Sequence, residues 1–472
     1  MKNNNLKIIL CLLLPAIVLV IPASYFPIDN VTVVEQRVIS LFLLAALFWI
    51  FEPIPIYATS VLIIVLELIM VSDKGLNILI ADKANEGFGQ LLNYKSIMGT
   101  FASPIILLFL GGFFLAMAST KYRLDQNLAR VLLKPFGTKP SMIILGLMSI
   151  TAVFSMFMSN TATTAMMLSI IAPVLIYYGQ NDPGKTAMAL CIPIAANIGG
   201  LGTPIGTPPN ALALKYLTGD NMVGFGQWMS FGVPFVIVLL AIAWILLIKI
   251  FPSNTKEIKL EIKGKFLKTK KAIIVYVTFV GTILMWLFDF VHGMNSYTVA
   301  MIPVAIFLAF DIITKEDLKK LSWDVLWLVS GGIALGLALG ESGLAEHVVG
   351  SIPFDTFSPY IIIVLAAVMA TVMANFMSNT ATANLLLPII AAVGVSVLSL
   401  ESLGGSKMLI LGTTLAASLG MALPISTPPN ALAHATGEIQ TNQMAKMGII
   451  IGAIGLGMVF LTLYILKMVN FY

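Results

Sequence analysis

Residues 157–163, Phe-Met-Ser-Asn-Thr-Ala-Thr, recur letter for letter at residues 376–382, which is 219 positions further along the chain. A second stretch, Thr-Pro-Pro-Asn-Ala-Leu-Ala at residues 207–213, recurs at residues 427–433 with a spacing of 220. Gly111-Gly112 and Gly331-Gly332 form a third, shorter pair. Because stretches rich in Asn, Thr and Pro do not arise from an apolar composition alone, these landmarks predict a duplicated unit.

The composition indicates a membrane protein. The chain has 472 residues, of which 58% are hydrophobic and 10% charged, whereas roughly a quarter of the residues of soluble domains are charged. A large soluble protein would lack the polar residues to cover its core, and the short alternating segments of a β-barrel are missing. Long apolar runs predict about ten to twelve membrane-spanning helices plus shorter re-entrant pieces. These runs include residues 8–21, 38–50, 61–71, 144–158, 231–250, 272–288, 299–310, 360–373 and 449–466.

The distribution of basic residues predicts the orientation. Eight lysines and two glutamates lie in residues 249–271, and a second basic segment covers residues 121–139. Short basic loops next to spans follow the positive-inside rule better than they suggest a nucleic-acid surface. We therefore expect both loops and the N-terminus to be cytoplasmic in a multi-pass protein of the plasma membrane. Lys2 and Lys7 precede the first apolar run, which we interpret as an uncleaved helix rather than a secretory signal.

The duplication divides the chain into four parts. We expect an N-terminal helix in residues 1–32, a first repeat in residues 33–250, a basic cytoplasmic linker in residues 251–271 and a second repeat in residues 272–472. Repeats of secondary transporters are often inverted across the membrane, with the binding site at their interface. Inversion would follow from an odd number of crossings between Asn160 and Asn379.

Each repeat carries polar residues and a helix breaker inside apolar sequence. The Pro-Pro pairs at residues 208–209 and 428–429 cannot continue an α-helix, and Thr207 and Thr427 stand where an N-cap belongs. Such a break is tolerated at membrane depth only where it faces protein or a watery cavity. Helix–helix hydrogen bonding by Ser and Thr and a purely structural kink are the alternatives. Two equivalent copies favour a binding site.

An anion is the ligand that these motifs suit. Residues 141–180 and 356–400 contain no charged side chain, so neither Ser-Asn-Thr motif lies beside an arginine clamp. Helix N-termini attract anions through their free N–H groups, and Asn, Ser and Thr add further donors. Two donor sets fit a ligand with an acceptor at each end, such as a dicarboxylate. Interrupted backbone also offers carbonyl oxygens for sodium.

The paired Ser-Asn-Thr and Thr-Pro-Pro-Asn motifs resemble those of the divalent anion/sodium symporter family of di- and tricarboxylate transporters, over nearly the whole chain. The resemblance implies an all-α polytopic membrane protein with two inverted repeats. It also implies about eleven transmembrane helices plus two re-entrant hairpins, a homodimer, and an elevator movement of a transport domain against a scaffold. The hairpins would begin near residues 98–115 and 323–339.

The resemblance also assigns site residues. Those expected to contact the substrate are Ser159, Asn160, Thr161, Thr207, Ser378, Asn379, Thr380, Thr427 and Pro428. Those expected to bind sodium, the only ion or cofactor implied, are Ser155, Ser159, Asn160, Gly206 and Asn379. The second sodium site departs from the family pattern, because Ala374 replaces a polar residue and Ser426 a small apolar one. This departure leaves sodium symport and dicarboxylate exchange both open.

The expected function is secondary active transport of C4–C5 dicarboxylates such as succinate, fumarate, malate or 2-oxoglutarate, with citrate or another divalent anion as the alternative. An enzyme would need a nucleophile with a base or a metal set, and neither is present in the sequence. A passive channel fits two half-sites within one chain less well. Glu67 and His434 stay open: Glu67 is either a functional intramembrane carboxylate or a paired one, and His434 follows the second Thr-Pro-Pro-Asn block. Cys11 and Cys191 show no disulfide or metal spacing.

Overall fold

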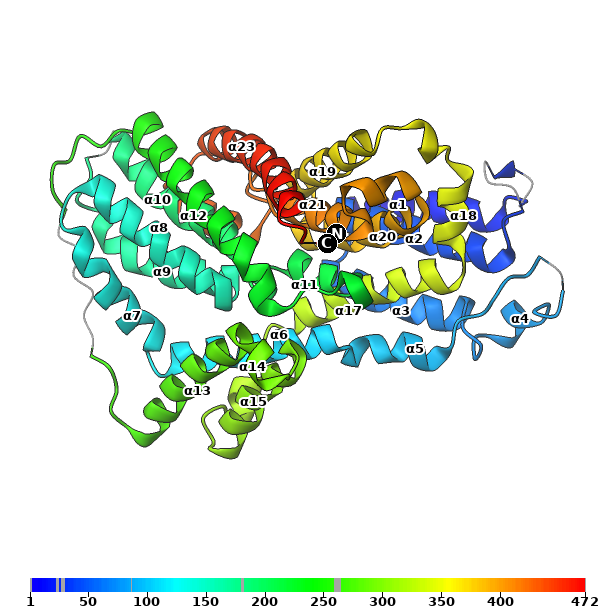
Figure 1. Ribbon diagram of the computed structural model, residues 1–472, viewed down its shortest axis with the longest axis horizontal. Helices are drawn as coiled ribbons and strands as arrows, with labels where there is room; N and C mark the ends of the chain where they lie inside the picture. The colour runs from blue at the N-terminus through cyan, green and yellow to red at the C-terminus, as the bar shows by residue number, and fades with distance from the viewer. Residues whose placement is uncertain are drawn as a thin grey trace.

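The structure is a computed structural model that describes residues 2–22, 25–26, 30–85, 87–179, 182–258 and 265–471. All long elements in these ranges are α-helices (Figure 1). The first half contains α1 (Lys2–Val20), α2 (Val33–Phe51), α3 (Ile56–Met70), α4 (Asn77–Ile80), α5 (Tyr94–Gly99), α6 (Pro104–Lys121), α7 (Leu124–Leu133), α8 (Pro140–Phe157), α9 (Asn160–Leu175), α10 (Pro183–Gly200), α11 (Pro208–Leu214) and α12 (Phe225–Ile250). The second half contains α13 (Lys270–Leu287), α14 (Asp289–His292), α15 (Ser296–Ala309), α16 (Lys315–Leu318), α17 (Trp323–Glu341), α18 (Leu344–Ser351), α19 (Pro359–Phe376), α20 (Asn379–Ser396), α21 (Gly405–Ala417), α22 (Pro428–Ala435) and α23 (Thr441–Met468).

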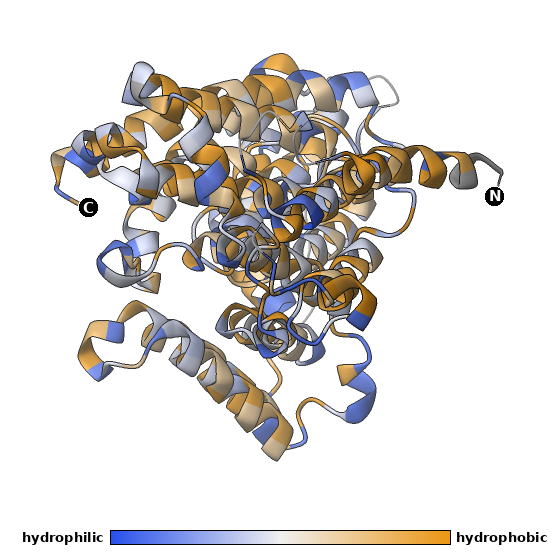
Figure 2. Cartoon of the chain, turned by 90° about the vertical axis from the view of Figure 1, so that its right-hand side faces the viewer, coloured by the Kyte–Doolittle hydropathy of each residue, from blue (hydrophilic) through white to orange (hydrophobic). Residues whose placement is uncertain are grey.

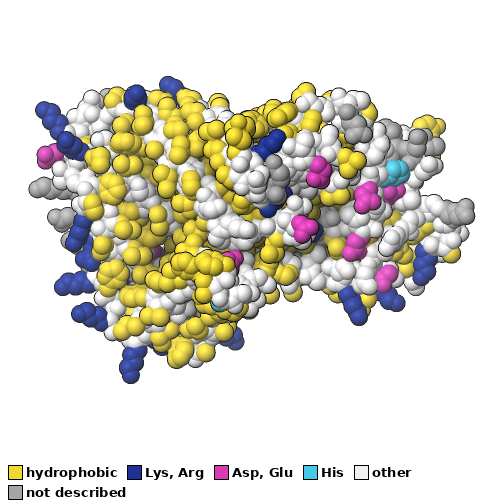
Figure 3. Space-filling model, viewed as in Figure 1, with side chains coloured by type: hydrophobic (Ala, Val, Ile, Leu, Met, Phe, Trp, Pro, Cys, Tyr) yellow, Lys and Arg dark blue, Asp and Glu magenta, His cyan; other side chains and the backbone are white. Residues whose placement is uncertain are grey.

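The helices have the length and composition of membrane spans. In the described part of the chain, nine helical segments are long and apolar enough to cross a membrane, and four more are apolar but shorter. Figure 2 shows apolar residues along most of the helices, and Figure 3 shows that hydrophobic side chains cover much of one face. These helices confirm the predicted all-α polytopic fold.

The order of elements in the first half returns in the second. The sequence landmarks place α6 opposite α17, α8 and α9 opposite α19 and α20, and α11 opposite α22. In both halves a long helix precedes a helical hairpin, and a broken pair of helices and a long final helix follow. The duplicated sequence therefore builds the same succession of elements twice.

The hairpins do not begin where we expected them. Residues 98–115 belong to α5, a short 3₁₀ turn and α6, and residues 323–339 lie within the single helix α17. The hairpins are instead α8–α9 and α19–α20, and each Ser-Asn-Thr motif stands at the turn between their two arms. The Gly-Gly pairs, the third landmark of the duplication, lie inside the continuous helices α6 and α17.

Those glycines are sites of close helix packing. A Cβ on Gly331 of α17 would collide with Ser60 of α3, and a Cβ on Gly111 of α6 would collide with Ala300 of α15. Thus α17 packs on α3, and α6 packs on α15. The glycine helix of each half therefore packs against helices of the other half: α17 packs on α2 and α3, and α6 packs on α13 and α15.

The start of the basic linker is fastened to the helical body by Asp182. Its carboxylate accepts hydrogen bonds from Gly184 N at 2.8 Å, Asn254 N at 3.1 Å, Thr255 N at 3.0 Å and Thr255 Oγ1 at 2.8 Å. Burial raises the pKa of this carboxyl, but these four donors together outweigh burial and hold the pKa below its usual value. The N-cap of α10 and the linker after α12 are therefore joined at one charged residue.

We expect Gly331→Ala to destabilise the protein, because the new methyl group would force α3 and α17 apart. Overpacking of this kind costs about 1–3 kcal/mol. The matched control is Gly340→Ala in the same helix, where a Cβ meets no atom within 4 Å and alanine raises helix propensity. Melting curves of the detergent-purified variants test this difference. Equal melting temperatures for the two variants would contradict the proposed close packing.

Candidate functional site

The two Ser-Asn-Thr motifs each open a helix. Ser159 is the N-cap of α9 and Ser378 is the N-cap of α20, and the methionine before each serine is extended. Serine favours this position because its side chain can accept a bond from the first turn. Ser378 does so, with Ala381 N donating at 3.2 Å, whereas the Ser159 side chain makes no such bond. In both copies the motif presents the free N–H groups of a helix start.

The predicted helix breaks are confirmed. Helix α10 ends at Gly200 and α11 begins at Pro208, while α21 ends at Ala417 and α22 begins at Pro428. Thr207 and Thr427 are the N-caps, with nearly equal φ and ψ angles of −146° and 145° and of −143° and 149°. Thr427 Oγ1 accepts a bond from Asn430 N at 3.3 Å, and the Thr207 side chain caps nothing. The Thr207 hydroxyl is therefore free for another partner.

The asparagine of each Pro-Pro-Asn holds the broken backbone in place. Asn210 Nδ2 donates to the carbonyl oxygens of Gly200 at 3.0 Å and Thr203 at 2.9 Å. Asn430 Nδ2 donates to the carbonyls of Met421 at 2.7 Å and Leu423 at 3.0 Å, which are the equivalent region of the second half. These amides satisfy carbonyls that lost their helical donors, so they shape the loops rather than line the cavity.

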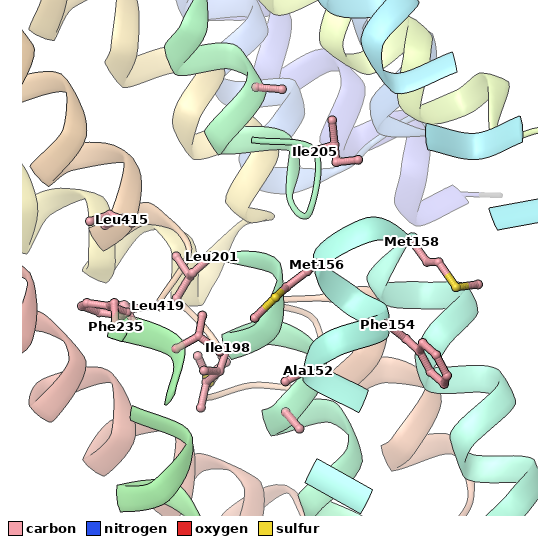
Figure 4. Close-up of a cluster of buried hydrophobic side chains, with 14 of the residues drawn as sticks. Ala152, Phe154, Met156, Met158, Ile198, Leu201, Ile205, Phe235, Leu415 and Leu419 are labelled. Carbon is pink, nitrogen blue, oxygen red and sulfur yellow. The ribbon is translucent and has the colours of Figure 1, made fainter. Parts of the chain in front are cut away.

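A further hydroxyl pins each loop to the neighbouring hairpin. Thr203 Oγ1 donates to the carbonyl of Met156, and Ser426 Oγ donates at 2.8 Å to the carbonyl of Asn375. Met156 and Asn375 occupy the same position three residues before their Ser-Asn-Thr motifs. Figure 4 shows Met156 between Ala152, Ile198 and Leu201, with Ile205 on the adjacent loop. Both hairpins are thus fixed to their broken helices by the same backbone atom.

One cavity of about 170 Å³ collects the motifs of both halves. The residues expected to contact the substrate all line it, namely Ser159, Asn160, Thr161, Thr207, Ser378, Asn379, Thr380, Thr427 and Pro428. Gly206 lines it too, and Ser155 lies behind it, fully buried. The structure therefore brings together residues from opposite ends of the chain. Whether they bind substrate stays a prediction.

The opposite wall of the cavity was missed by the sequence reasoning. It is formed by residues of α3, α6 and α17, among them Tyr57, Phe109, Asp324 and Leu328. The rings of Tyr57 and Trp327 lie 6.3 Å apart and join α3 to α17. Asp324 is the one charged side chain among the described residues that line the cavity. Its position in the first turn of α17 gave no sequence signal for a site, because acids are common at helix starts.

The first half fits the predicted sodium site. Ser155 Oγ contacts both Asn160 Oδ1 and, at 2.7 Å, the carbonyl oxygen of Ala196. A Cβ on Gly200 would lie 2.9 Å from the Gly206 carbonyl oxygen and 3.1 Å from Asn160 Oδ1, so only glycine leaves room for this gathering of oxygens. Neutral oxygen donors of this kind are the ligands that hard cations prefer.

The second half fits sodium less well. Ala374 offers no hydroxyl, and its Cβ instead packs against Gly420. With its amide oriented to match these acceptors, Asn379 donates to the carbonyls of Ala417 at 3.3 Å and Gly420 at 3.1 Å. Thr371, one turn earlier on α19, donates to the carbonyl of Ala416 at 3.1 Å. The second half therefore lacks the serine oxygen that stands behind the motif of the first half.

The two hairpins differ in exposure although their motifs are identical. Thr161 and Ala162 of α9 are exposed, whereas the equivalent Thr380 and Ala381 of α20 are 8% and 0% exposed. Helix α20 packs on α17, α18 and α11. The molecule is thus asymmetric about its two halves, and the cavity is covered on the α20 side.

The remaining singled-out residues lie outside the cavity lining. His434 is on α22, where its Nε2 lies 3.1 Å from Thr441 Oγ1. Glu67 is fully buried in α3, and neither of its carboxylate oxygens has a hydrogen-bond partner. Within the described residues, no three His, Cys, Asp or Glu side chains are grouped to hold a metal.

The family described as "Sodium:sulfate symporter transmembrane region" matches residues 2–469. The chain belongs to this family. Its members are transporters, so this protein is a transporter and not an enzyme, and the resemblance drawn from the paired motifs is confirmed.

Two relatives agree with this membership, and a solved structure shares the fold. The sodium-dependent dicarboxylate transporter SdcS of Staphylococcus saprophyticus is 31% identical over 98% of this chain and 92% of its own. The protein of the same name from Staphylococcus aureus strain USA300 is 33% identical over 90% of this chain and 85% of its own. The Alcanivorax borkumensis YdaH transporter, whose crystal structure has "an unusual topology", shares the fold with a TM-score of 0.56 at 11% identity, over 91% of this chain and 98% of its own.

We expect Ser155→Ala to weaken the binding of sodium at the predicted site in the first half. The substitution removes an oxygen behind the cavity, at a cost of about 1–3 kcal/mol, so the sodium concentration needed for half-maximal ligand binding should rise at least fivefold. Thr371→Ala is the matched control, because it removes a hydroxyl that binds the corresponding carbonyl in the second half. Sodium titrations of succinate binding by the purified proteins decide the matter. An unchanged sodium requirement in Ser155→Ala would remove this residue from the site.

Proposed function

We propose that this protein is a sodium-coupled secondary transporter of C4–C5 dicarboxylates, of which succinate, fumarate, malate and 2-oxoglutarate are the candidates. The observation that carries the proposal is that two identical Ser-Asn-Thr motifs line one cavity from opposite halves of the chain. The printed names of the relatives, sodium-dependent dicarboxylate transporters, support the same substrate class.

Neutral donors hold the two carboxylates. The N-termini of α9 and α20 carry partial positive charge and free N–H groups, and Asn160 and Thr207 add side-chain donors. Each motif serves one carboxylate, so the spacing of the motifs selects for a short diacid. A lysine or arginine in the cavity would bind the dianion more tightly but would also slow its release.

Sodium supplies the positive charge that the side chains lack. A cation held by the oxygens of Ser155, Asn160 and Gly206 stands directly behind the Ser-Asn-Thr motif of the first half. It offsets part of the charge of the dianion and fixes the orientation of the Asn160 amide. Coupling then follows from mutual dependence, since each ligand binds better when the other is present.

We further infer that the repeats are inverted. If α8–α9 returns to the side from which it entered, five crossings separate the two hairpins: the broken pair α10–α11, then α12, α13, α15 and α17. An odd number places the hairpins on opposite sides of the membrane. The basic segments 121–139 and 249–271 would place α8, the linker and the N-terminus on the cytoplasmic side of the plasma membrane.

The same arrangement supports alternating access by an elevator movement. The hairpins and broken helices would move as a transport domain against a scaffold of α1–α6 and α13–α17, because the cavity is lined by both sets. In the conformation seen here α9 is exposed and α20 is covered, so the cavity would open to the cytoplasm. The expected homodimer rests on the family resemblance.

We expect purified protein in proteoliposomes to take up labelled succinate when an inward sodium gradient is imposed, and Asn160→Ala or Asn379→Ala to abolish that uptake. Each substitution removes a donor that alanine cannot replace, at about 1–3 kcal/mol. The control Asn295→Ala removes an amide that caps α15 and lies outside the cavity lining. Uptake that ignores sodium and needs dicarboxylate inside the vesicles would instead show exchange.

Asp324 favours dicarboxylates over citrate, the alternative substrate. A carboxylate on the cavity wall repels a third negative charge by about 0.4–1.7 kcal/mol at a separation of ~10 Å, which is a factor of about two to fifteen. We therefore expect Asp324→Asn to raise inhibition by citrate, relative to succinate, by that factor. Glu316→Gln, which removes an exposed acid paired with Lys319, should leave the ratio unchanged. An equal ratio in the wild type and Asp324→Asn would refute this role.

A further inference from the structure

Glu67 is the least satisfied charged group of the membrane interior in the described structure. It lies on α3, is 0% exposed, and neither carboxylate oxygen has a hydrogen-bond partner. An unpaired carboxylate in such surroundings is costly, and α3 carries no Lys or Arg of its own. Glu67 therefore needs either a neighbouring positive charge or a proton.

Most charged side chains near α3 are already engaged with groups other than Glu67. Arg37 donates to the carbonyl of Met70 at 2.8 Å and lies over the Phe88 ring, and Glu35 bonds to His347 at 3.0 Å. The titratable or charged residues on or directly after the elements packed against α3 are Glu35, Arg37, Glu52, Tyr94, Lys95, Asp324 and Glu341, together with Lys215 and Tyr216 after α11. Tyr57 lies beside Trp327 and Ser60 packs on Gly331, so α3 and α17 run side by side and Glu67 lies level with residues 336–338 of α17. Lys215 reaches the same level, because a Cβ on Gly336 would lie 3.0 Å from its Nζ.

Lys215 approaches Glu67 from the broken helices rather than from the helices that surround α3. It follows α11, one of the broken helices, and its Nζ donates to the carbonyl of Ile333 on α17 at 2.6 Å. It also lies 5.3 Å from the centre of the Tyr216 ring. The carboxylates of Glu67 and Glu341 both attract it. Lys215 thus brings a positive charge from the proposed transport domain into the layer of α3 and α17.

The duplication confines this pair to one half of the chain. Gly331 packs against Ser60 and Gly111 packs against Ala300, so Ser60 of α3 corresponds to Ala300 of α15. Seven residues further on, Glu67 corresponds to Phe307, and the 220-residue spacing makes Ala435 the counterpart of Lys215. Both charges therefore occur together in one half and both are missing in the other.

We propose that Glu67 on α3 and Lys215 at the end of α11 attract each other beside α17 and so stabilise the conformation seen here, and that Glu67 binds a proton when Lys215 moves away. The proposal rests on the alternating-access part of the proposed function. In the opposite conformation α22 would take the place of α11 against the scaffold, and it brings Ala435 instead of a lysine. Glu67 then takes its proton from water, and returns it when Lys215 comes back.

A cysteine at position 381 reports which conformation is present. Ala381 is fully buried in α20, whereas the equivalent Ala162 of α9 is exposed, so exchange of the two environments would expose residue 381. The full-length Ala381→Cys protein, in a Cys11→Ser and Cys191→Ser background and in lipid vesicles, is labelled with a hydrophilic maleimide, and rates are corrected for the known pH dependence of thiol reactivity. No substrate is needed, so failure of dicarboxylate transport and failure of the charge pair are distinguishable.

We expect the corrected labelling rate to rise by a factor of roughly seventeen as the pH falls and Glu67 becomes protonated, the order expected for loss of one charge pair separated by ~10 Å at an effective dielectric constant near 20. Glu67→Gln and Lys215→Met should each label faster at neutral pH and lose this pH dependence. The double variant Glu67→Gln/Lys215→Met should resemble the single variants rather than add their effects.

Lys185→Met is the control, because it removes the lysine of another ion pair, 2.6 Å from Glu438, and should retain the wild-type pH dependence. The proposal is overturned if the pH dependence survives in Glu67→Gln, or if the effects of the two single variants add in the double variant. A thermal melt of each variant separates a shift of conformation from loss of folding.

Discussion

The structure depends on one constraint: backbone that leaves a helix inside the membrane must still find hydrogen-bond partners. The breaks at residues 201–207 and 418–427 leave carbonyl groups without helical donors. Asn210 and Asn430 donate to them from within the next helix, and Thr203 and Ser426 tie the same loops to the hairpins. With these carbonyls satisfied internally, the loops hold their shape beside the starts of α9 and α20, whose first N–H groups remain free.

This division of labour explains how a chain with few charges can hold an anion. A lysine or arginine buried at this depth costs at least about 2.5–3.5 kcal/mol, and it would have to be neutralised in every conformation without substrate. Helix N-termini and amides carry no such cost, because they are neutral when the site is empty. The sequence places its one cavity-lining charge, among the described residues, on the acidic Asp324. In the proposed function, this carboxylate would limit the charge of the ligand rather than attract it.

The sequence predicted the residues that meet at the cavity better than it predicted the hairpins. Duplicated motifs with prolines carry strong local signals, so the breaks at Pro208 and Pro428 and the caps at Thr207 and Thr427 were found correctly. The turns at Ser159 and Ser378 contain neither Gly nor Pro, and so the apolar runs around them resemble parts of ordinary spans. The resemblance placed the hairpin starts at the helices that carry the Gly-Gly pairs, where Gly111 and Gly331 instead serve close helix contact. Asp324, Tyr57 and the proximity of Glu67 to Lys215 depend on tertiary packing, for which sequence spacing gives no signal.

An exact repeat would give a transporter two end states of equal energy, apart from the difference between the two sides of the membrane. This chain repeats its ligand-facing motifs letter for letter but varies what stands behind them: Ser155 against Ala374 at the sodium oxygens, and Lys215 against Ala435 at the interface. In the proposed elevator movement the motifs travel with the ligand, so selectivity for substrate can stay the same in both conformations. The energy difference between the conformations is set by residues that touch no substrate, and it can change without altering what is carried.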